Sequence, residues 1–266
     1  MCFVGFIALC LPALARSVAE QHRLDAALVS AVNNSELARV RNLLKQGANP
    51  NVRDGNGDPL LFDALDTGSA LLFKCLLDHG ANPNARSEYG MSILAAASYT
   101  GWTEAGYHPF EDVKLLVSKG ADVNARDRDG ATPIVTAAST NSIYTLKFLI
   151  AQGARIGDAD NHGQTALMDA CYAEGEASYY CPETAMALIM KGADVNARDK
   201  DGNTALMWLA RNDSEDADLL RIVRALLAHG SKINFRNRFG STALGMAKAN
   251  HLNNLARLLK HAGGHE

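Results

Sequence analysis

The sequence has few of the features that mark nucleic-acid-binding, membrane-spanning or metal-binding proteins. The net charge is −3, so the sequence lacks the excess of cations that would predict a polyanion-binding surface. An apolar, uncharged run of fifteen residues, MCFVGFIALCLPALA, opens the sequence. It is shorter than the roughly 20 residues of a membrane span. Cys171 and Cys181, without nearby extra ligands, make a weak case for zinc, and no metal or cofactor is expected.

The opening run fits a secretory signal peptide better than a structural helix. Ala13-Leu14-Ala15 matches the small-x-small pattern of a cleavage site, so we expect a signal peptide over residues 1–15, cut after Ala15. Pro12 would interrupt a helix. The location expected from this leader is periplasmic or secreted, with no membrane span after cleavage. The alternative is a cytoplasmic protein in which the same segment forms an apolar helix.

A short motif recurs along the rest of the chain. Gly-Ala-x-x-Asn occurs as GANPN from Gly47 and Gly80 and as GADVN from Gly120 and Gly192, with degenerate copies GARIG and GSKIN from Gly153 and Gly230. A second glycine follows ten residues after each first one and opens segments such as GATPIVTAA and GNTALMWLA. This pattern resembles the ankyrin repeat, with its T-P-L-H-x-A signature and period near 33 residues. The resemblance covers residues 24–262 and implies an all-α solenoid of about seven stacked helix-turn-helix units.

The residue types within each unit suit a helical hairpin. A Thr or Ser precedes the inner helix as its N-cap, and Pro133 fits a first helical turn. Val113, Leu116 and Val117 place a buried stripe on an outer helix. The first glycine of each motif, such as Gly120, ends that helix in the left-handed conformation. The stretch around the second glycine predicts a turn between units.

Three units are longer than the basic period. Successive first glycines are separated by 33, 40, 33, 39 and 38 residues. The extra residues lie between inner and outer helices, as WTEAGYHPFED (102–112), EGEASYYCPET (174–184) and NDSEDADLL (212–220). The first two insertions gather scarce aromatic residues and the third is acidic. Insertions in repeat proteins often map to a binding face, so these loops are one candidate contact surface.

Two short matches to functional motifs are better explained by the repeat. HPFED at residues 108–112 resembles the opening of the Fic nucleotidyl-transferase motif, but the Gly-Asn-Gly-Arg phosphate cradle does not follow. We therefore predict the start of an outer helix there and no catalytic residue. DADNHG from Asp158 has the look of a calcium loop, but His162 stands where an oxygen ligand is needed.

The second candidate contact surface is the concave face that ankyrin repeats form from finger turns and inner helices. Positions flanking the second glycine and exposed inner-helix positions would contact a partner there. Trp208 is expected to pack in the core instead. Over both surfaces the predicted partner-binding residues are Tyr89, Met91, Tyr99, Trp102, Tyr107, Phe110, Arg128, His162, Tyr172, Tyr179, Tyr180, Arg211 and Phe239.

Cys171 and Cys181 bracket the second insertion. In an oxidising compartment they would staple that loop, and we predict that they form a disulfide. A pair of free thiols is the alternative, because sequence does not settle the geometry.

The function expected from these features is that of an exported, non-catalytic module that binds a protein partner and is monomeric alone. The alternatives are an immunity or accessory protein that inhibits or protects one secreted or periplasmic enzyme, and a cytosolic ankyrin scaffold. No nucleic-acid partner is expected.

Overall fold

The computed structural model describes residues 7–99, 109–140, 142–172, 181–212 and 215–266, with side chains from Val18 onward. These residues form fourteen α-helices and, within the same ranges, no β-strand beyond three isolated bridges. The predicted all-α fold of paired helices is therefore confirmed. Contacts divide the chain into two compact units, one of residues 1–93 and 102–121 and one of residues 94–101 and 122–266.

The first unit has an inner and an outer row of helices. The inner row is α1 (Ile7–Asn33) and α3 (Leu60–Asp66), and the outer row is α2 (Leu37–Lys45), α4 (Ala70–Asp78) and α6 (Phe110–Ser118). Helices pack within each row and between rows, as α1 does on α2 and on α3. Helix α5 (Ile93–Ser98) begins in this unit at Ile93, and its residues from Leu94 onward belong to the second unit.

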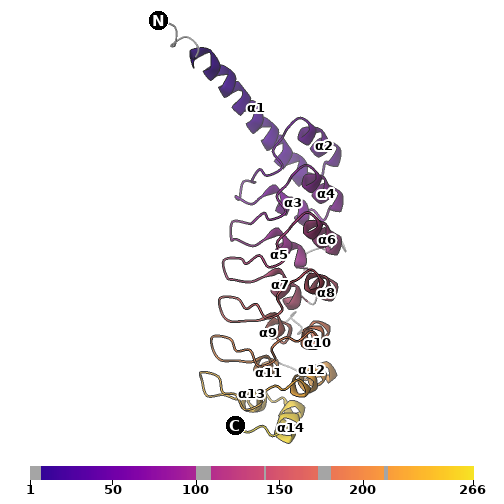
Figure 1. The fold of residues 1–266 in the computed structure, drawn as a ribbon, viewed down its shortest axis with the longest axis vertical. Helices are drawn as coiled ribbons and strands as arrows, with labels where there is room; N and C mark the ends of the chain where they lie inside the picture. The colour runs from indigo at the N-terminus through magenta and orange to yellow at the C-terminus, as the bar shows by residue number, and fades with distance from the viewer. Residues whose placement is uncertain (1–6, 100–108, 141, 173–180, 213–214) are drawn as a thin grey trace. The chain divides into compact units, whose positions relative to one another are not determined.

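The second unit repeats the arrangement. Its inner row is α7 (Pro133–Ser139), α9 (Ala166–Ala170), α11 (Ala205–Leu209) and α13 (Ala243–Ala249), and its outer row is α8 (Ile143–Ala151), α10 (Pro182–Met190), α12 (Ala217–Ala228) and α14 (Asn253–His261). Each inner helix packs on the next inner helix, and each outer helix packs on the next outer one. In both units the finger turns extend from the inner helices on the side away from the outer row (Figure 1).

Helix α1 is longer than the sequence indicates. It continues through Pro12, so the expected interruption is absent. A proline inside a helix removes one backbone hydrogen bond but leaves the chain able to continue beyond it. Among the described residues, none of the helices combines the length and apolar character needed to cross a bilayer.

The capping predictions hold for some inner helices and fail for others. Thr165 and Thr242 accept hydrogen bonds from the backbone N–H groups of Met168 (3.4 Å) and Gly245 (3.2 Å). Thr132 and Thr204 occupy the same position without such a bond. In these two helices the backbone N–H of the third residue after the threonine donates to the threonine's backbone carbonyl instead. The distance is 3.0 Å at Thr132 and 2.9 Å at Thr204. Pro133 does occupy the first turn of α7.

Asparagine side chains join neighbouring repeats within each unit. Asn124 Nδ2 donates to the Gly153 carbonyl oxygen (3.2 Å), and Asn124 Oδ1 accepts the Arg155 N–H (2.9 Å). The same pair of bonds recurs at Asn51, Asn196 and Asn234, and Asn84 makes the first of them. The Asn of the recurring motif is therefore a bridge from one repeat to the carbonyl of the next first glycine.

A second set of bonds ties the ends of the inner helices in the second unit. Ser142 Oγ donates to the Ser98 carbonyl (3.2 Å), and Asn250 Nδ2 donates to the Ala210 carbonyl (2.8 Å). Asn212 Nδ2 bonds the Cys171 carbonyl in the same way (3.2 Å). These contacts satisfy carbonyls that an α-helix leaves without an internal partner.

Candidate functional site

The finger turns of the second unit are rigid because a side chain closes each of them. Asp160 Oδ1 accepts the N–H groups of His162 (2.7 Å) and Gln164 (2.8 Å). Asp199 does the same for Asp201 (2.9 Å) and Asn203 (2.8 Å), and Asn237 supplies its amide oxygen in the last finger. DADNHG is thus an Asp-capped finger, as the repeat predicts.

Backbone hydrogen bonds run from finger to finger. The N–H groups of Asn161, Lys200 and Arg238 donate to the carbonyls of Asp129 (2.7 Å), His162 (2.8 Å) and Asp201 (2.8 Å) in the preceding fingers. The fingers approach so closely that a Cβ on Gly163 would lie 3.1 Å from the Asp199 backbone. The side chains of the finger tips are therefore displayed from one continuous hydrogen-bonded ladder.

An aromatic cluster lies beneath the ladder. The Tyr172 and Trp208 rings are 4.5 Å apart, and the Arg211 guanidinium lies over both, 4.5 Å from the Trp208 centroid and 5.5 Å from that of Tyr172. Trp208 Nε1 donates to Asp199 Oδ2 (3.1 Å). Trp208 is 7% exposed, so its predicted place in the core is confirmed.

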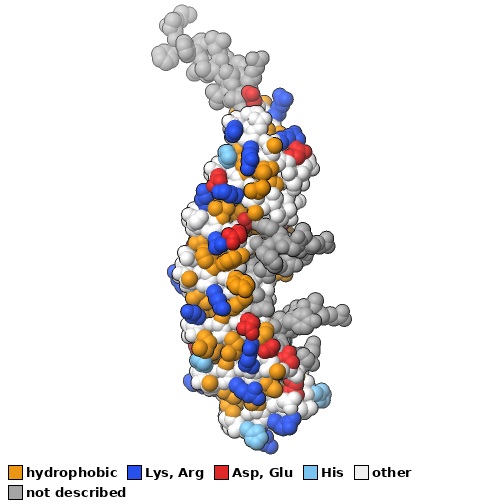
Figure 2. Space-filling view, turned by 90° about the vertical axis from the view of Figure 1, so that its right-hand side faces the viewer, with side chains coloured by type: hydrophobic (Ala, Val, Ile, Leu, Met, Phe, Trp, Pro, Cys, Tyr) orange, Lys and Arg blue, Asp and Glu red, His pale blue; other side chains and the backbone are white. Residues whose placement is uncertain are grey.

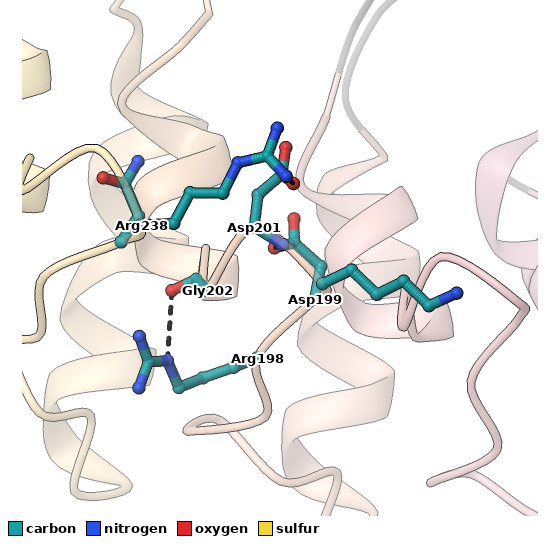
Figure 3. A pocket seen from close by; sticks show the side chains of 7 residues that line it. Arg198, Asp199, Asp201, Gly202 and Arg238 are labelled. Atoms are coloured by element: carbon teal, nitrogen blue, oxygen red, sulfur yellow. Dashed lines mark hydrogen bonds and ion pairs between the residues drawn. The ribbon is translucent and has the colours of Figure 1, made fainter.

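Two hollows open between these fingers. One, of about 230 Å³, is lined by His162, Gln164, Lys200, Trp208 and both Asp199 and Asp201. The other, of about 370 Å³, lies between the last two fingers (Figure 3). There Arg198 donates to the Gly202 carbonyl (3.2 Å), while Arg238 forms an ion pair with Asp201 (2.8 Å). Both hollows are open to solvent and are lined mainly by charged and polar residues together with the aliphatic parts of their side chains.

One carboxyl group beside the aromatic cluster has an unusual proton affinity. Asp169, in α9, lies largely out of solvent, and burial followed by the nearby Asp160 carboxylate raises its pKa to about 7. The group therefore carries only part of a negative charge at neutral pH.

The structure brings several predicted residues of the second unit together. Tyr172 and Arg211 stack on Trp208, and His162 lines the adjoining hollow. Arg128, His162 and Phe239 occupy finger tips and are exposed, Phe239 at 68%. Tyr99 follows α5 and is 39% exposed. Their accessibility agrees with a contact role, and that role stays a prediction.

The remaining predicted residues lie elsewhere. Tyr89 and Met91 flank a finger glycine of the first unit and are 76% and 39% exposed. Phe110 opens α6 with the Lys114 ammonium 5.0 Å above its ring, and Glu111 and Asp112 lie in the first turn, so the predicted helix start is confirmed. Trp102, Tyr107, Tyr179 and Tyr180 lie outside the described residues.

The two cysteines that bracket the second insertion are separate thiols in the structure, so the predicted disulfide is not formed in it. Both side chains are buried. Cys181 precedes α10 and its Sγ donates to the Ser139 carbonyl (3.8 Å), in the place where Ser142 bonds the Ser98 carbonyl one repeat earlier. Cys181 therefore contributes as a hydrogen-bond donor between repeats.

Sequence reasoning missed the arginine that braces five of the six fingers; Ala159 holds this position in the finger of Gly163. Arg126 Nη1 donates to the Gly130 carbonyl (3.1 Å) and to the Ala159 carbonyl of the next finger (2.8 Å). Arginines four residues before the second glycine make the equivalent bond in other fingers, at Arg53, Arg86, Arg198 and Arg236. The signal was present as an arginine that recurs at a fixed distance from that glycine.

Comparison with known proteins agrees with this architecture. A family model of ankyrin repeats in three copies matches residues 28–127, 102–199 and 175–265. The proteins named Ankyrin repeat and SOCS box protein 6 of Homo sapiens and of Pongo abelii are each 31% identical to the chain in an alignment of 131 residues that covers 44% of the chain. The chain spans 31% of the length of these relatives. The chain belongs to the ankyrin repeat family.

Proposed function

We propose that this chain is a non-catalytic protein-binding protein and that it holds its partner on the fingers and inner helices of the second unit. Ankyrin repeats imply protein–protein interaction, and proteins built from them are typically binding modules without catalysis. The observation that carries the choice of surface is the ladder of finger-to-finger hydrogen bonds, which displays exposed side chains from a fixed backbone.

The physical basis is preorganisation. Ordering loops on binding costs free energy, and a surface already held by hydrogen bonds avoids much of that cost. Phe239 offers an exposed aromatic side chain of the kind that dominates interface energies, and Arg238 stacks 4.7 Å from its ring centroid. The adjoining hollows accept side chains of the partner.

A site-specific photocrosslinker tests the choice of surface. The full chain would carry p-benzoylphenylalanine in place of Phe239, with a second version carrying it in place of Tyr144 on α8. Both side chains are exposed aromatics, at 68% and 75%. We expect a discrete adduct from position 239 and none from position 144 in an extract of the native cells. An adduct from position 144 alone would place the interface on the outer helices, and no adduct from either would contradict the proposed function.

The His108 segment provides a separate test of the absence of catalysis. Its match to a nucleotidyl-transferase motif covers five residues and lacks the phosphate cradle. His108→Ala should bind the partner as the unaltered chain does. Loss of a measured nucleotide-transfer activity in this variant would overturn the non-catalytic assignment.

We further propose that the protein is exported after cleavage behind Ala15. The support is the uncharged apolar opening and its small-x-small end. Mass spectrometry of the mature N-terminus decides the question. A chain that starts at Arg16 is expected, whereas an intact Met1 in the mature protein would make the cytoplasmic alternative the correct one.

A further inference from the structure

The carboxylates that close the fingers of the second unit are already engaged by the fold. Asp127 Oδ1 accepts the Ala131 N–H (2.8 Å), and Asp160 and Asp199 each accept two N–H groups of their own turns. Asp199 also accepts the Trp208 indole N–H. The oxygens of these acids are occupied by the fold, although the carboxylates keep their charge and Asp199 also lines both hollows.

The cations of the same surface are in a different situation. Arg128, Lys200 and Arg211 are exposed, and their charged groups have no hydrogen bond or ion pair to any residue that the structure describes. Arg211 lies over the Trp208 and Tyr172 rings, which orients its guanidinium while leaving its N–H groups open. Arg126 and Arg238, by contrast, already have carboxylate partners, Asp158 and Asp201.

Few acids on this surface are without a hydrogen bond or ion pair. The Asp201 carboxylate is engaged by Arg238, and Asp129 is the exposed acid next to Arg128. The Asp169 carboxyl is partly protonated near neutral pH because burial and Asp160 raise its pKa to about 7. On the finger and inner-helix surface of the second unit, the cations without a hydrogen bond or ion pair therefore outnumber the acids without one, Asp129 being the acid of this kind among the described finger residues.

Judged in the same way, the fingers of the first unit offer no cation of this kind among the described residues. Arg53 and Arg86 donate to the carbonyls of Gly57 and Gly90 inside their own fingers, and Asp54, Asp58 and Glu88 lie beside them. An anionic ligand would be repelled there. The difference in charge selects the second unit as its binding surface.

We propose that the partner binds through an acidic segment of its chain, whose Asp and Glu carboxylates lie along the second unit's fingers and pair with Arg128, Lys200 and Arg211. Arg211 presents a fixed fork for a bidentate carboxylate contact, and Lys200 contributes a point charge at the neighbouring hollow. This inference rests on the proposed function and adds the chemistry of the partner to it.

Selection from a displayed library of random peptides tests the inference without knowledge of the partner. Three versions of the full chain serve as bait: unaltered, the triple variant Arg128→Glu, Lys200→Glu and Arg211→Glu, and a matched triple variant Lys147→Glu, Lys191→Glu and Arg224→Glu. The matched residues are exposed on or at the ends of the outer helices α8, α10 and α12, and each triple changes the net charge equally. Circular dichroism verifies that both variants are folded.

We expect the unaltered and matched baits to enrich peptides with an excess of Asp and Glu, and the finger variant to lose that enrichment. Enriched peptides without an acidic excess would overturn this inference while leaving the proposed function intact. Failure of the unaltered bait to enrich any peptide would contradict both. Equal loss of acidic peptides by the two triple variants would also overturn it, because net charge alone would then explain binding.

A direct titration gives the magnitude. The probe is a fluorescein-labelled peptide of alternating Glu and Ser, and its control has Gln in place of each Glu. We expect the Glu peptide to bind the unaltered chain at least about tenfold more tightly than the Gln peptide, with an affinity that falls as salt is added. Equal binding of the two peptides, or no effect of salt, would overturn the inference.

Discussion

At the residue scale, the glycines of this chain do two different tasks. Gly153 ends α8 with a φ of +90°, and a Cβ built on it would meet nothing within 4 Å. Gly163 has a similar φ of +79° at a finger tip, but there the backbone of Asp199 in the next finger is only 3.1 Å from the added Cβ. Glycine is required at position 153 by the backbone dihedral angles alone. At position 163 it is required also because a neighbouring backbone leaves no room for a side chain.

Alanine substitution should separate these two requirements. Gly153→Ala imposes only the left-handed backbone penalty of about 1 kcal/mol. Gly163→Ala should cost about 1–3 kcal/mol more, because one of two hydrogen-bonded fingers must shift. Urea unfolding of both variants measures the difference. Equal losses of stability would show that the fingers separate freely at this point.

The thiols provide a second prediction at this scale. Burial raises the pKa of Cys171 far above that of an exposed thiol, so reactive thiolate is scarce there. Under native conditions an alkylating reagent should modify Cys171 only as fast as the second unit opens, and modification should be complete in denaturant. Mass spectrometry of a time course measures this. Rapid labelling of the native protein would contradict the buried placement.

At the scale of structural elements, one step of the asparagine bridge is missing. Asn124 and Asn196 each bond to the first glycine of the following repeat, but Gly157 occupies the corresponding position between them. The side chain that would reach the Gly192 carbonyl is absent there. The sequence showed this copy as degenerate, and the structure shows that the degeneracy removes two hydrogen bonds.

Gly157→Asn should restore the bridge. A Cβ at this position meets nothing within 4 Å, and the residue does not have a positive φ. We expect the free energy of unfolding to rise by about 1–2 kcal/mol, from two partly exposed hydrogen bonds and a less flexible unfolded chain. Gly157→Ala is the control for chain flexibility alone. If the two variants are equally stable, the bridge does not form.

At the scale of the whole molecule, stability depends on carboxyl groups that the fold has moved out of water. Burial, followed by the charges of Asp54, Asp66 and Asp58, raises the pKa of Asp63 to about 6, and Asp169 has a pKa of about 7. An unfolded aspartic acid titrates near 3.9. The folded chain therefore holds these two protons more tightly than the unfolded chain, so their contribution is full below about pH 4 and is lost as pH rises through about 6 to 7.

Replacement by asparagine should remove this dependence. For Asp63→Asn and Asp169→Asn separately, we expect the gain in free energy of unfolding relative to the unaltered chain to be larger at pH 8 than at pH 4 by about 1–3 kcal/mol. Asp129→Asn, at an exposed finger position, is the control for the substitution itself. Melting curves across this range measure the effect. A gain that is the same at both pH values would show that these carboxylates are better solvated than the structure indicates.

Much of the candidate surface was predictable because its positions recur. The period located the finger tips, so Arg128, His162 and Phe239 were found from sequence and are exposed in the structure. The contacts between those positions were not predictable. That Arg211 lies over Trp208, and that Asp199 holds the indole, depends on packing between two turns of different repeats.

The sequence by itself determined the helical hairpins of the repeats and where most of their helices end, because glycine conformation, apolar periodicity and turn chemistry act within a few residues of one another. It did not determine which caps form, since Thr132 and Thr204 occupy the same repeat position as the capping threonines but close a tighter backbone turn instead. Tertiary structure alone decided which charges are engaged within the fold and which face a partner. Whether a charged side chain is accessible depends on donors and acceptors from other repeats. These groups are close in space but far apart in the sequence, so the sequence does not show which of them meet.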